Sequence, residues 1–283
     1  MPGSVRLLRS ARRGFDRPAG FLQDPDARAH LAGYLADLTR PYQLTVPPEQ
    51  FASPDGLGQS YGEMAEALIA EVVSADEPVD LLVLAFAMPD MWPGRATATY
   101  LSHVCPGTPL SFAICEQGSA AAFSGLRVIR DQLGSTGGDR RALLLVVEQA
   151  VLPYPAPGAR TADRHQAVAL LFGTERSDGT EPDGRSLELT GLRIRGGAAP
   201  AAVAELATSE LAALTAELAG QPRLLVSASL AAAWPAADAA VAPAGQPITG
   251  LWWQLLDEPA GPLLLADYEP DLGYLSLAAF TTG

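Results

Sequence analysis

Short, almost wholly apolar runs alternate with amphipathic segments along the 283 residues of this chain. The clearest runs are residues 80–87 (DLLVLAFA), 141–147 (RALLLVV) and 223–230 (RLLVSASL). Runs with so few polar positions are typical of strands in a parallel sheet that is covered on both faces. The alternation with helical periodicity therefore predicts an α/β fold.

The order of these segments repeats along the chain. Each half is expected to run strand, helix, strand, helix, strand, helix, strand, strand, which predicts two domains over residues 1–175 and 176–283 with an acidic, glycine-rich loop (174–184) between them. The predicted strands cover residues 4–10, 80–87, 109–115, 141–147 and 166–172, then 186–194, 223–230, 238–241, 262–266 and 273–279. The predicted helices cover residues 26–38, 58–73, 119–133, 201–219 and 248–256, and a further helix is expected to open at Pro93 and to run through Thr97 and Leu101 until Pro106 and Gly107 end it.

Composition excludes several classes of function. The chain has no lysine, so it cannot form a Schiff base or use the lysine of a phosphate-binding loop. A formal net charge of −13 and a pI of about 4.6 argue against a nucleic-acid partner, because such binding depends on clustered positive charge.

Cysteine content and hydropathy indicate the setting. Cys105 and Cys115 are the two cysteines of the sequence, too few for a disulfide scaffold, so a reducing cytoplasm is expected. The basic N-terminus lacks the apolar stretch of a signal peptide, and no run is long enough to span a membrane. The spacing of histidines and cysteines predicts no metal site.

Several local sequences resemble those of ketoacyl synthases of the type III kind, members of the thiolase superfamily. The segment VDLLVLAFAMPD (79–90) resembles the strand before the nucleophile helix, and TPLSFAICEQGSAAAFSGLRVIRDQL (108–133) resembles the strand, elbow and helix that carry the active cysteine. RALLLVVEQAVL (141–152) resembles the strand that follows this helix. DRHQAVALLF (163–172) resembles a run that is glycine-rich in the family but has no glycine here, and GQPITGLWWQLL (245–256) resembles the start of the last helix. The resemblance implies the thiolase-like fold, with duplicated βαβαβαββ halves stacked in five layers.

At the matched positions, this chain has other residue types than the catalytic residues of that family. Counting back from Leu126 places the nucleophile position at Ser119, where the family has cysteine. The family histidine should follow RLLV by two residues, and that position is Ala228. The family asparagine falls on Gln246. The resemblance therefore implies a chain depleted in the residues that support decarboxylative condensation.

Two residues remain candidates for an acyl acceptor. Cys115 lies four residues before the matched position, and a one-turn slip would bring its thiol to the elbow; otherwise it is a small core residue. Ser119 could act as a nucleophile if a base lies within hydrogen-bond reach, or it could cap the helix that follows. Gln117, Glu148 and Gln246 are candidate substrate-binding residues, because amides and strand-end carboxylates can contact an acyl group.

These residues leave two functions open. The resemblance favours a non-condensing partner subunit, like the chain-length factors that pair with active ketosynthases in polyketide or fatty-acid biosynthesis. The alternative is an acyltransferase or atypical ketosynthase that uses Ser119 or Cys115. Either function implies that the substrate is acyl-CoA or a phosphopantetheinyl acyl-carrier protein and that no cofactor is bound. Either also implies a homodimer or a heterodimer with a ketosynthase. The expected dimer contact is the apolar strand at residues 109–114, because an uncovered apolar edge invites pairing.

Overall fold

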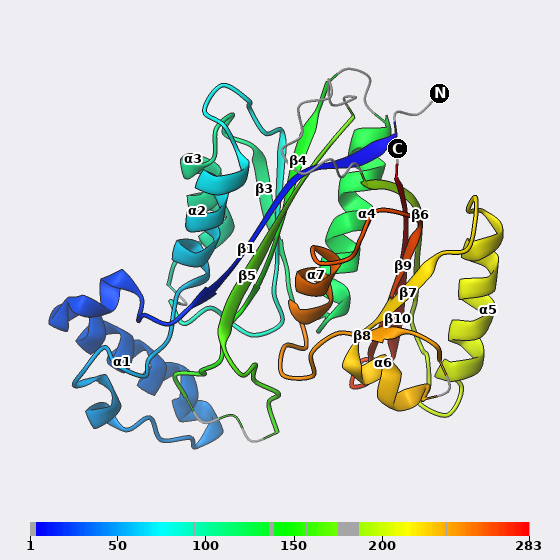
Figure 1. The fold of residues 1–283 in the computed structure, drawn as a ribbon. Helices are drawn as coiled ribbons and strands as arrows, with labels where there is room; N and C mark the ends of the chain where they lie inside the picture. Colours follow the sequence, from blue (N-terminus) through cyan, green and yellow to red (C-terminus); the bar gives the residue numbers. More distant parts are fainter. Residues whose placement is uncertain are drawn as a thin grey trace.

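The computed structural model describes residues 4–92, 94–135, 139–154, 156, 158–174, 187–235 and 237–282. Both ends of the described chain lie close together at one side of the molecule (Figure 1). The domain boundary predicted at residue 175, and most of the predicted 174–184 loop, lie outside the described residues.

The two halves of the chain have the same order of elements. In the first half the strands and helices are β1 (Val5–Phe15), α2 (Tyr61–Val72), β2 (Leu81–Ala85), α3 (Thr97–Val104), β3 (Leu110–Ile114), α4 (Ala120–Ser135), β4 (Arg141–Glu148) and β5 (His165–Gly173). In the second half they are β6 (Leu187–Arg195), α5 (Val203–Ala216), β7 (Arg223–Val226), α6 (Ala228–Ala233), β8 (Ala240–Val241), α7 (Gly250–Leu255), β9 (Leu263–Glu269) and β10 (Tyr274–Thr282). The predicted βαβαβαββ order is thereby confirmed in both halves.

All ten described strands join one sheet, in the order β3-β2-β4-β5-β1-β6-β10-β9-β7-β8. β2 pairs in parallel with β3 and β4, and β7 pairs in parallel with β8 and β9, whereas the other pairings are antiparallel. The first five strands and the last five therefore follow the same internal order, read outward from the β1–β6 contact. β3 and β8 are the two edges of the sheet.

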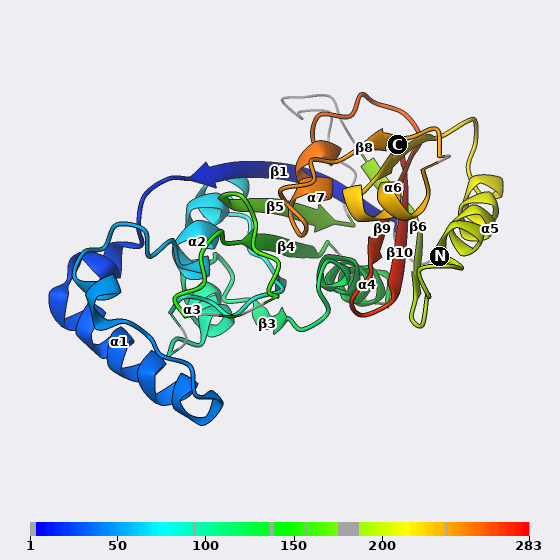
Figure 2. The same ribbon diagram turned by 90° about the horizontal axis from the view of Figure 1, so that it is seen from below.

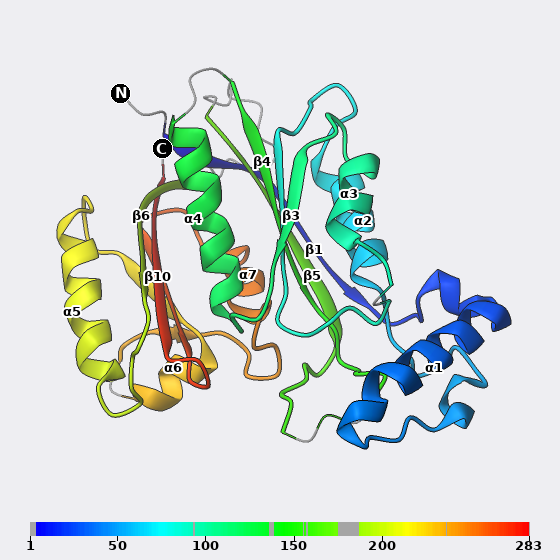
Figure 3. The ribbon, with the colours of Figure 1, turned by 180° about the vertical axis from the view of Figure 1, so that it is seen from behind.

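The helices lie in layers on the faces of this sheet. α4 and α7 lie between the two halves, α2 and α3 cover the outer face of the first, and α5 and α6 cover the outer face of the second (Figures 1 and 3). Phe123 of α4 and Trp252 of α7 meet in the middle layer with their ring centroids 4.9 Å apart. Residues of β2 and β4 alternate between the central core and the outer core, which explains why these strands are apolar on both faces.

A small additional lobe has no counterpart in the second half. It contains α1 (Pro25–Thr39) and the short 3₁₀ turns η1 (Gly20–Gln23), η2 (Arg40–Tyr42) and η3 (Pro48–Phe51). Its own small core includes Leu22, Leu35 and Phe51. The lobe projects from the end of the first half, away from the second half (Figures 1 and 2).

One predicted element is wrong. Residues 223–230 form β7 only as far as Val226, and α6 begins at Ala228. The break occurs at Ser227, whose side chain accepts a hydrogen bond from the Leu230 amide and so caps the new helix. Within the described ranges, no helix combines the length and apolarity that crossing a bilayer requires.

Candidate functional site

The connection between β3 and α4 is a tight elbow. Glu116 and Gly118 both have positive φ angles, of 61° and 54°. At Gly118 an added Cβ would lie 2.0 Å from the Glu269 side chain, so only glycine fits both the backbone conformation and the space. The elbow presents the first amides of α4 to the second half of the molecule.

A carboxylate of the second half occupies the beginning of α4. Glu269, the last residue of β9, accepts a hydrogen bond from the Ser119 backbone N–H, with an N–O distance of 3.0 Å. Its other oxygen is 2.7 Å from a guanidinium nitrogen of Arg160. The N-terminus of a helix favours an anion because its amides are unpaired and its dipole is positive there. In this chain the anion is a buried side chain of the protein itself.

The hydroxyl of Ser119 donates to Asp267 over 2.5 Å, and the second Glu269 contact to this hydroxyl is longer, at 3.4 Å. Burial raises the pKa of Asp267 to about 6, against the lowering effect of hydrogen bonds from Ser119 and Ser227. The hydroxyl of Ser119, the residue directly before α4, is thus directed to Asp267 of the second half. The pair does supply what a serine nucleophile needs nearby, a carboxylate that can accept its proton.

The beginning of α7 is held in a similar way from the first half. Glu148, the last residue of β4, accepts from the backbone N–H groups of Ile248 and Thr249 at 2.9 and 3.1 Å. The Thr249 hydroxyl also donates to it, at 2.7 Å. Burial raises the pKa of Glu148, and these hydrogen bonds counteract part of that rise.

Gln246 and Gln166 complete this second cluster. The Thr249 hydroxyl lies 3.3 Å from the Gln166 amide nitrogen and 3.4 Å from the Gln246 carbonyl oxygen. Gln246 is buried, and its amide nitrogen has no hydrogen-bond partner among the described residues. The structure thus places the predicted residues Glu148 and Gln246 in one cluster at the start of α7.

A pocket of about 210 Å³ joins the two clusters. Its walls include Gly118 of the elbow, Ile248 before α7, and the paired side chains of Arg160 and Glu269. Ser119 is buried behind this wall and does not line the pocket. A ligand in the pocket would meet the Arg160–Glu269 ion pair before it reached the hydroxyl.

Cys115 lies in a different environment. Its thiol is exposed and lines a separate pocket of about 430 Å³. That pocket is bounded by the ends of β2 and β3 and by the segment that leads into α3, with Asp90, Trp92 and Arg95 among its walls. Gln117 is half-buried, and its carbonyl oxygen accepts a hydrogen bond from Ser124 at 2.5 Å. Neither residue joins the Ser119 cluster.

Five side chains of the two clusters were missed in the sequence: Arg160, Gln166, Thr249, Asp267 and Glu269. Asp267 and Glu269 left a signal, because acids two positions apart in an otherwise apolar strand lie on the same face of it. Arg160 lies in an irregular segment and carries no comparable pattern. Over the ranges that the structure covers, no group of three histidine, cysteine or acidic side chains has the arrangement of a metal site.

Comparison with solved structures identifies the architecture. ChlB3, described as an acyltransferase, superposes with a TM-score of 0.65 at 14% identity, covering 99% of this chain and 98% of its own. AbyA1, a tetronic acid condensing enzyme, gives 0.63 at 16% identity, with 98% and 99% covered. The 3-oxoacyl-(acyl carrier protein) synthase III of Pseudomonas aeruginosa gives 0.59 at 14% identity, with 99% of each chain covered.

The fold is thiolase-like. The expectation drawn from the local resemblances is therefore confirmed for the architecture, including the duplicated halves. No protein-family model matches the sequence, and no curated protein matches it. At such low identities the thiolase-like fold is what the likeness establishes, and the chemistry has to be argued from the site.

Proposed function

We propose that this thiolase-fold protein is a non-condensing partner subunit of an active ketosynthase-type enzyme, in biosynthesis that uses acyl thioesters. The observation that carries the proposal is the hydrogen bond from the Ser119 amide to the buried carboxylate of Glu269. An acyl-transfer site needs this region free for a thiolate or for the oxyanion of a tetrahedral intermediate. A fixed carboxylate repels both of these anions.

The matched positions support the same conclusion. Ala228 is the first residue of α6 and stands where the related enzymes are expected to have histidine. An alanine side chain can neither donate a hydrogen bond nor transfer a proton. In a complex, the active partner would supply the condensation chemistry, and this chain would supply surface and shape.

A second candidate function is acyl transfer at Cys115. Its exposed thiol on a pocket of about 430 Å³ is the specific observation in its favour, since a reactive cysteine must be accessible. Ser119 is the less accessible acceptor, although Asp267 lies within reach of its hydroxyl. The substrate for either residue would be acyl-CoA or an acyl-carrier thioester.

Intact-mass spectrometry after incubation with acyl-CoA and with acyl-carrier protein separates the two functions. The partner proposal expects no covalent acyl adduct on the isolated chain. An adduct that disappears in Cys115→Ala or Ser119→Ala but persists in the control Cys105→Ala would overturn it in favour of acyl transfer. Co-purification with a ketosynthase encoded beside this chain would add direct support.

A further inference from the structure

The additional lobe around α1 contains a pocket that plays no part in the proposed function. The pocket has a volume of about 320 Å³ and is lined by seven residues from η1, from α1 and from the segment after β2. They are Phe21, Ala27, His30, Leu31, Tyr34, Trp92 and Gly94. This volume lies at the lower end of the range for small-molecule sites, enough for a ligand of one or two rings.

One wall of the pocket is a fixed pair of aromatic rings. Phe21 and Trp92 are stacked with their centroids 4.1 Å apart and an interplanar angle of 26°. The Arg95 guanidinium lies 4.8 Å from the Trp92 ring centroid and 3.2 Å from the ring centroid of Tyr100 in α3. These contacts tie the wall to the body of the first half, so the wall is in place before any ligand arrives.

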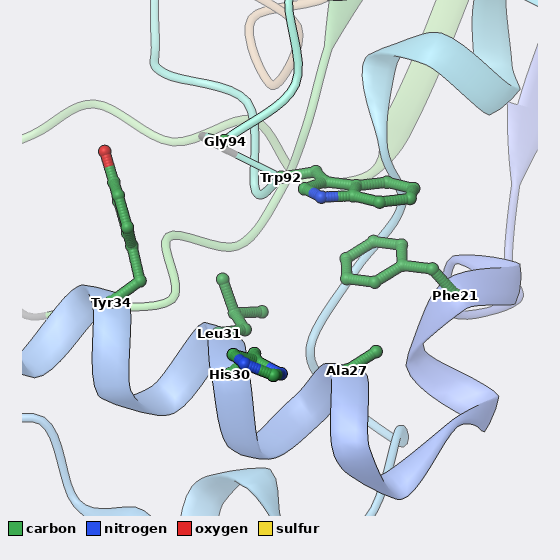
Figure 4. A pocket seen from close by; sticks show the side chains of 7 residues that line it. All are labelled: Phe21, Ala27, His30, Leu31, Tyr34, Trp92 and Gly94. Atoms are coloured by element: carbon green, nitrogen blue, oxygen red, sulfur yellow. The ribbon is translucent and has the colours of Figure 1, made fainter.

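The opposite wall is an aromatic ring with free surface. Tyr34 is 47% exposed, and its hydroxyl forms no hydrogen bond with the residues that the structure describes. Figure 4 shows Leu31 rising from α1 between Tyr34 on one side and the Phe21–Trp92 pair on the other. Ala27 lies one turn earlier on the same helix, where its small side chain leaves room.

The lining fixes the chemistry of the ligand. None of the seven residues is a carboxylate or an arginine, so a charged ligand would lose hydration without gaining an ion pair. Three aromatic rings around one gap favour another ring, which can stack on one of them and meet the others edge to face. Almost all of the surface that these residues present to the pocket is apolar, so the ligand would be held by ring packing and not by hydrogen bonds.

We propose that the pocket between α1 and Trp92 binds a small, neutral aromatic molecule that lies over Leu31, with Tyr34 on one side and the Phe21–Trp92 pair on the other. This site is separate from the cluster at the start of α4, and neither pocket shares a lining residue with the other. The proposal therefore stands or fails independently of the partner role.

The test uses 2-naphthol as the probe, with binding followed by ligand-observed NMR and by calorimetry on the full chain. Saturable binding at one site is expected. Ala27→Phe, which fills the floor, and Tyr34→Ala, which removes one wall, should each weaken it at least tenfold. Tyr42→Ala is the matched control, because Tyr42 is 73% exposed and does not line the pocket.

Circular dichroism melting of each variant shows whether the lobe still folds, and the exposed positions of Tyr34 and Tyr42 make both alanine variants tolerable. Equal affinity in Tyr34→Ala, Tyr42→Ala and the unchanged chain would overturn the proposal. The proposal would also be overturned if 1-octanol displaced 2-naphthol at the same concentration as phenols do. The pocket would then accept an alkyl chain as readily as a ring.

Discussion

Glu148 and Glu269 hold corresponding positions in the two halves, and each binds the central helix of the opposite half. Each is the last residue of its half's fourth strand. Each accepts the backbone N–H of the residue directly before that helix, Thr249 before α7 and Ser119 before α4. The two halves are thus fastened by a reciprocal pair of buried carboxylates.

This reciprocity links stability to the proposed lack of condensation. The helix starts that would face a substrate are bonded instead to the chain's own carboxylates. The same contacts satisfy buried amides that would otherwise lack partners, so the chain has a structural reason to keep them.

Replacing Glu148 by alanine should therefore destabilise the protein strongly. The change leaves the buried Ile248 and Thr249 amides without an acceptor and the Thr249 hydroxyl with only the longer contact to Gln246, at a cost of about 2–4 kcal/mol in the free energy of unfolding. Urea denaturation measures it. Glu217→Ala is the control, since the exposed ion pair of Glu217 with Arg193 should contribute less than about 1 kcal/mol. Equal losses in the two variants would contradict the fastening role.

The elevated pKa of Asp267 predicts a pH-dependent stability. The pKa of its carboxyl rises from 3.8 to about 6 on folding, so between these values the folded state binds more protons than the unfolded one. Stability from this group is present below about pH 4 and is lost as the pH rises through about 6, up to about 3 kcal/mol. Asp267→Asn keeps an acceptor for Ser119 and removes the titration. The difference in unfolding free energy between the two proteins should follow this curve, and a pH-independent difference would show that Asp267 titrates normally.

Some elements of the fold and some site residues could be predicted from the sequence, and others could not. β2 and β4 were predictable because their residues contact helices on both sides and show no polar face. The α6 start was missed because Ser227 interrupts an apolar run without changing its periodicity. Glu148 was recognised by its position at a strand end, but the role of Glu269 depends on a partner 150 residues away in the sequence. The spacing of Asp267 and Glu269 places both acids on one face of the strand, but nothing in the local sequence identifies Ser119 as their partner.

The two cysteines should differ sharply in reactivity. Cys115 is exposed, whereas Cys105 is buried and burial raises its pKa to about 11. Because the thiolate is the reactive form, iodoacetamide at pH 8 should modify the native protein once, at Cys115. Peptide mass mapping identifies the site, and unfolding in urea should expose the second. Modification of Cys105 at a comparable rate in the native state would mean that the α3 region opens readily.

The apolar edge strand β3 predicts assembly. Leu110 of β3 is 69% exposed at one edge of the sheet, and Val241 of β8 is 52% exposed at the other. We expect a dimer that forms through β3, because an uncovered apolar edge favours pairing with another chain. Leu110→Arg should give monomers in light scattering, and Val241→Arg, the matched change at the opposite edge, should not. A stable monomer of the unchanged chain, alone and with a candidate ketosynthase, would contradict this expectation.

The last prediction concerns decarboxylation. Release of CO₂ from malonyl thioesters should be undetectable for the isolated chain, because Ala228 provides no group that can assist the step. Glu269→Ala frees the Ser119 amide, and Ser119→Cys restores a thiol at the matched position, yet neither change supplies a hydrogen-bond donor at residue 228. The single variants and their combination should therefore stay inactive when radiolabelled CO₂ is counted. Adding Ala228→His to the combined variant is the informative step: if activity appears only then, the matched positions in both halves are correct. Decarboxylation by the unchanged chain would show that another residue performs the proton transfer and that the chain condenses by itself.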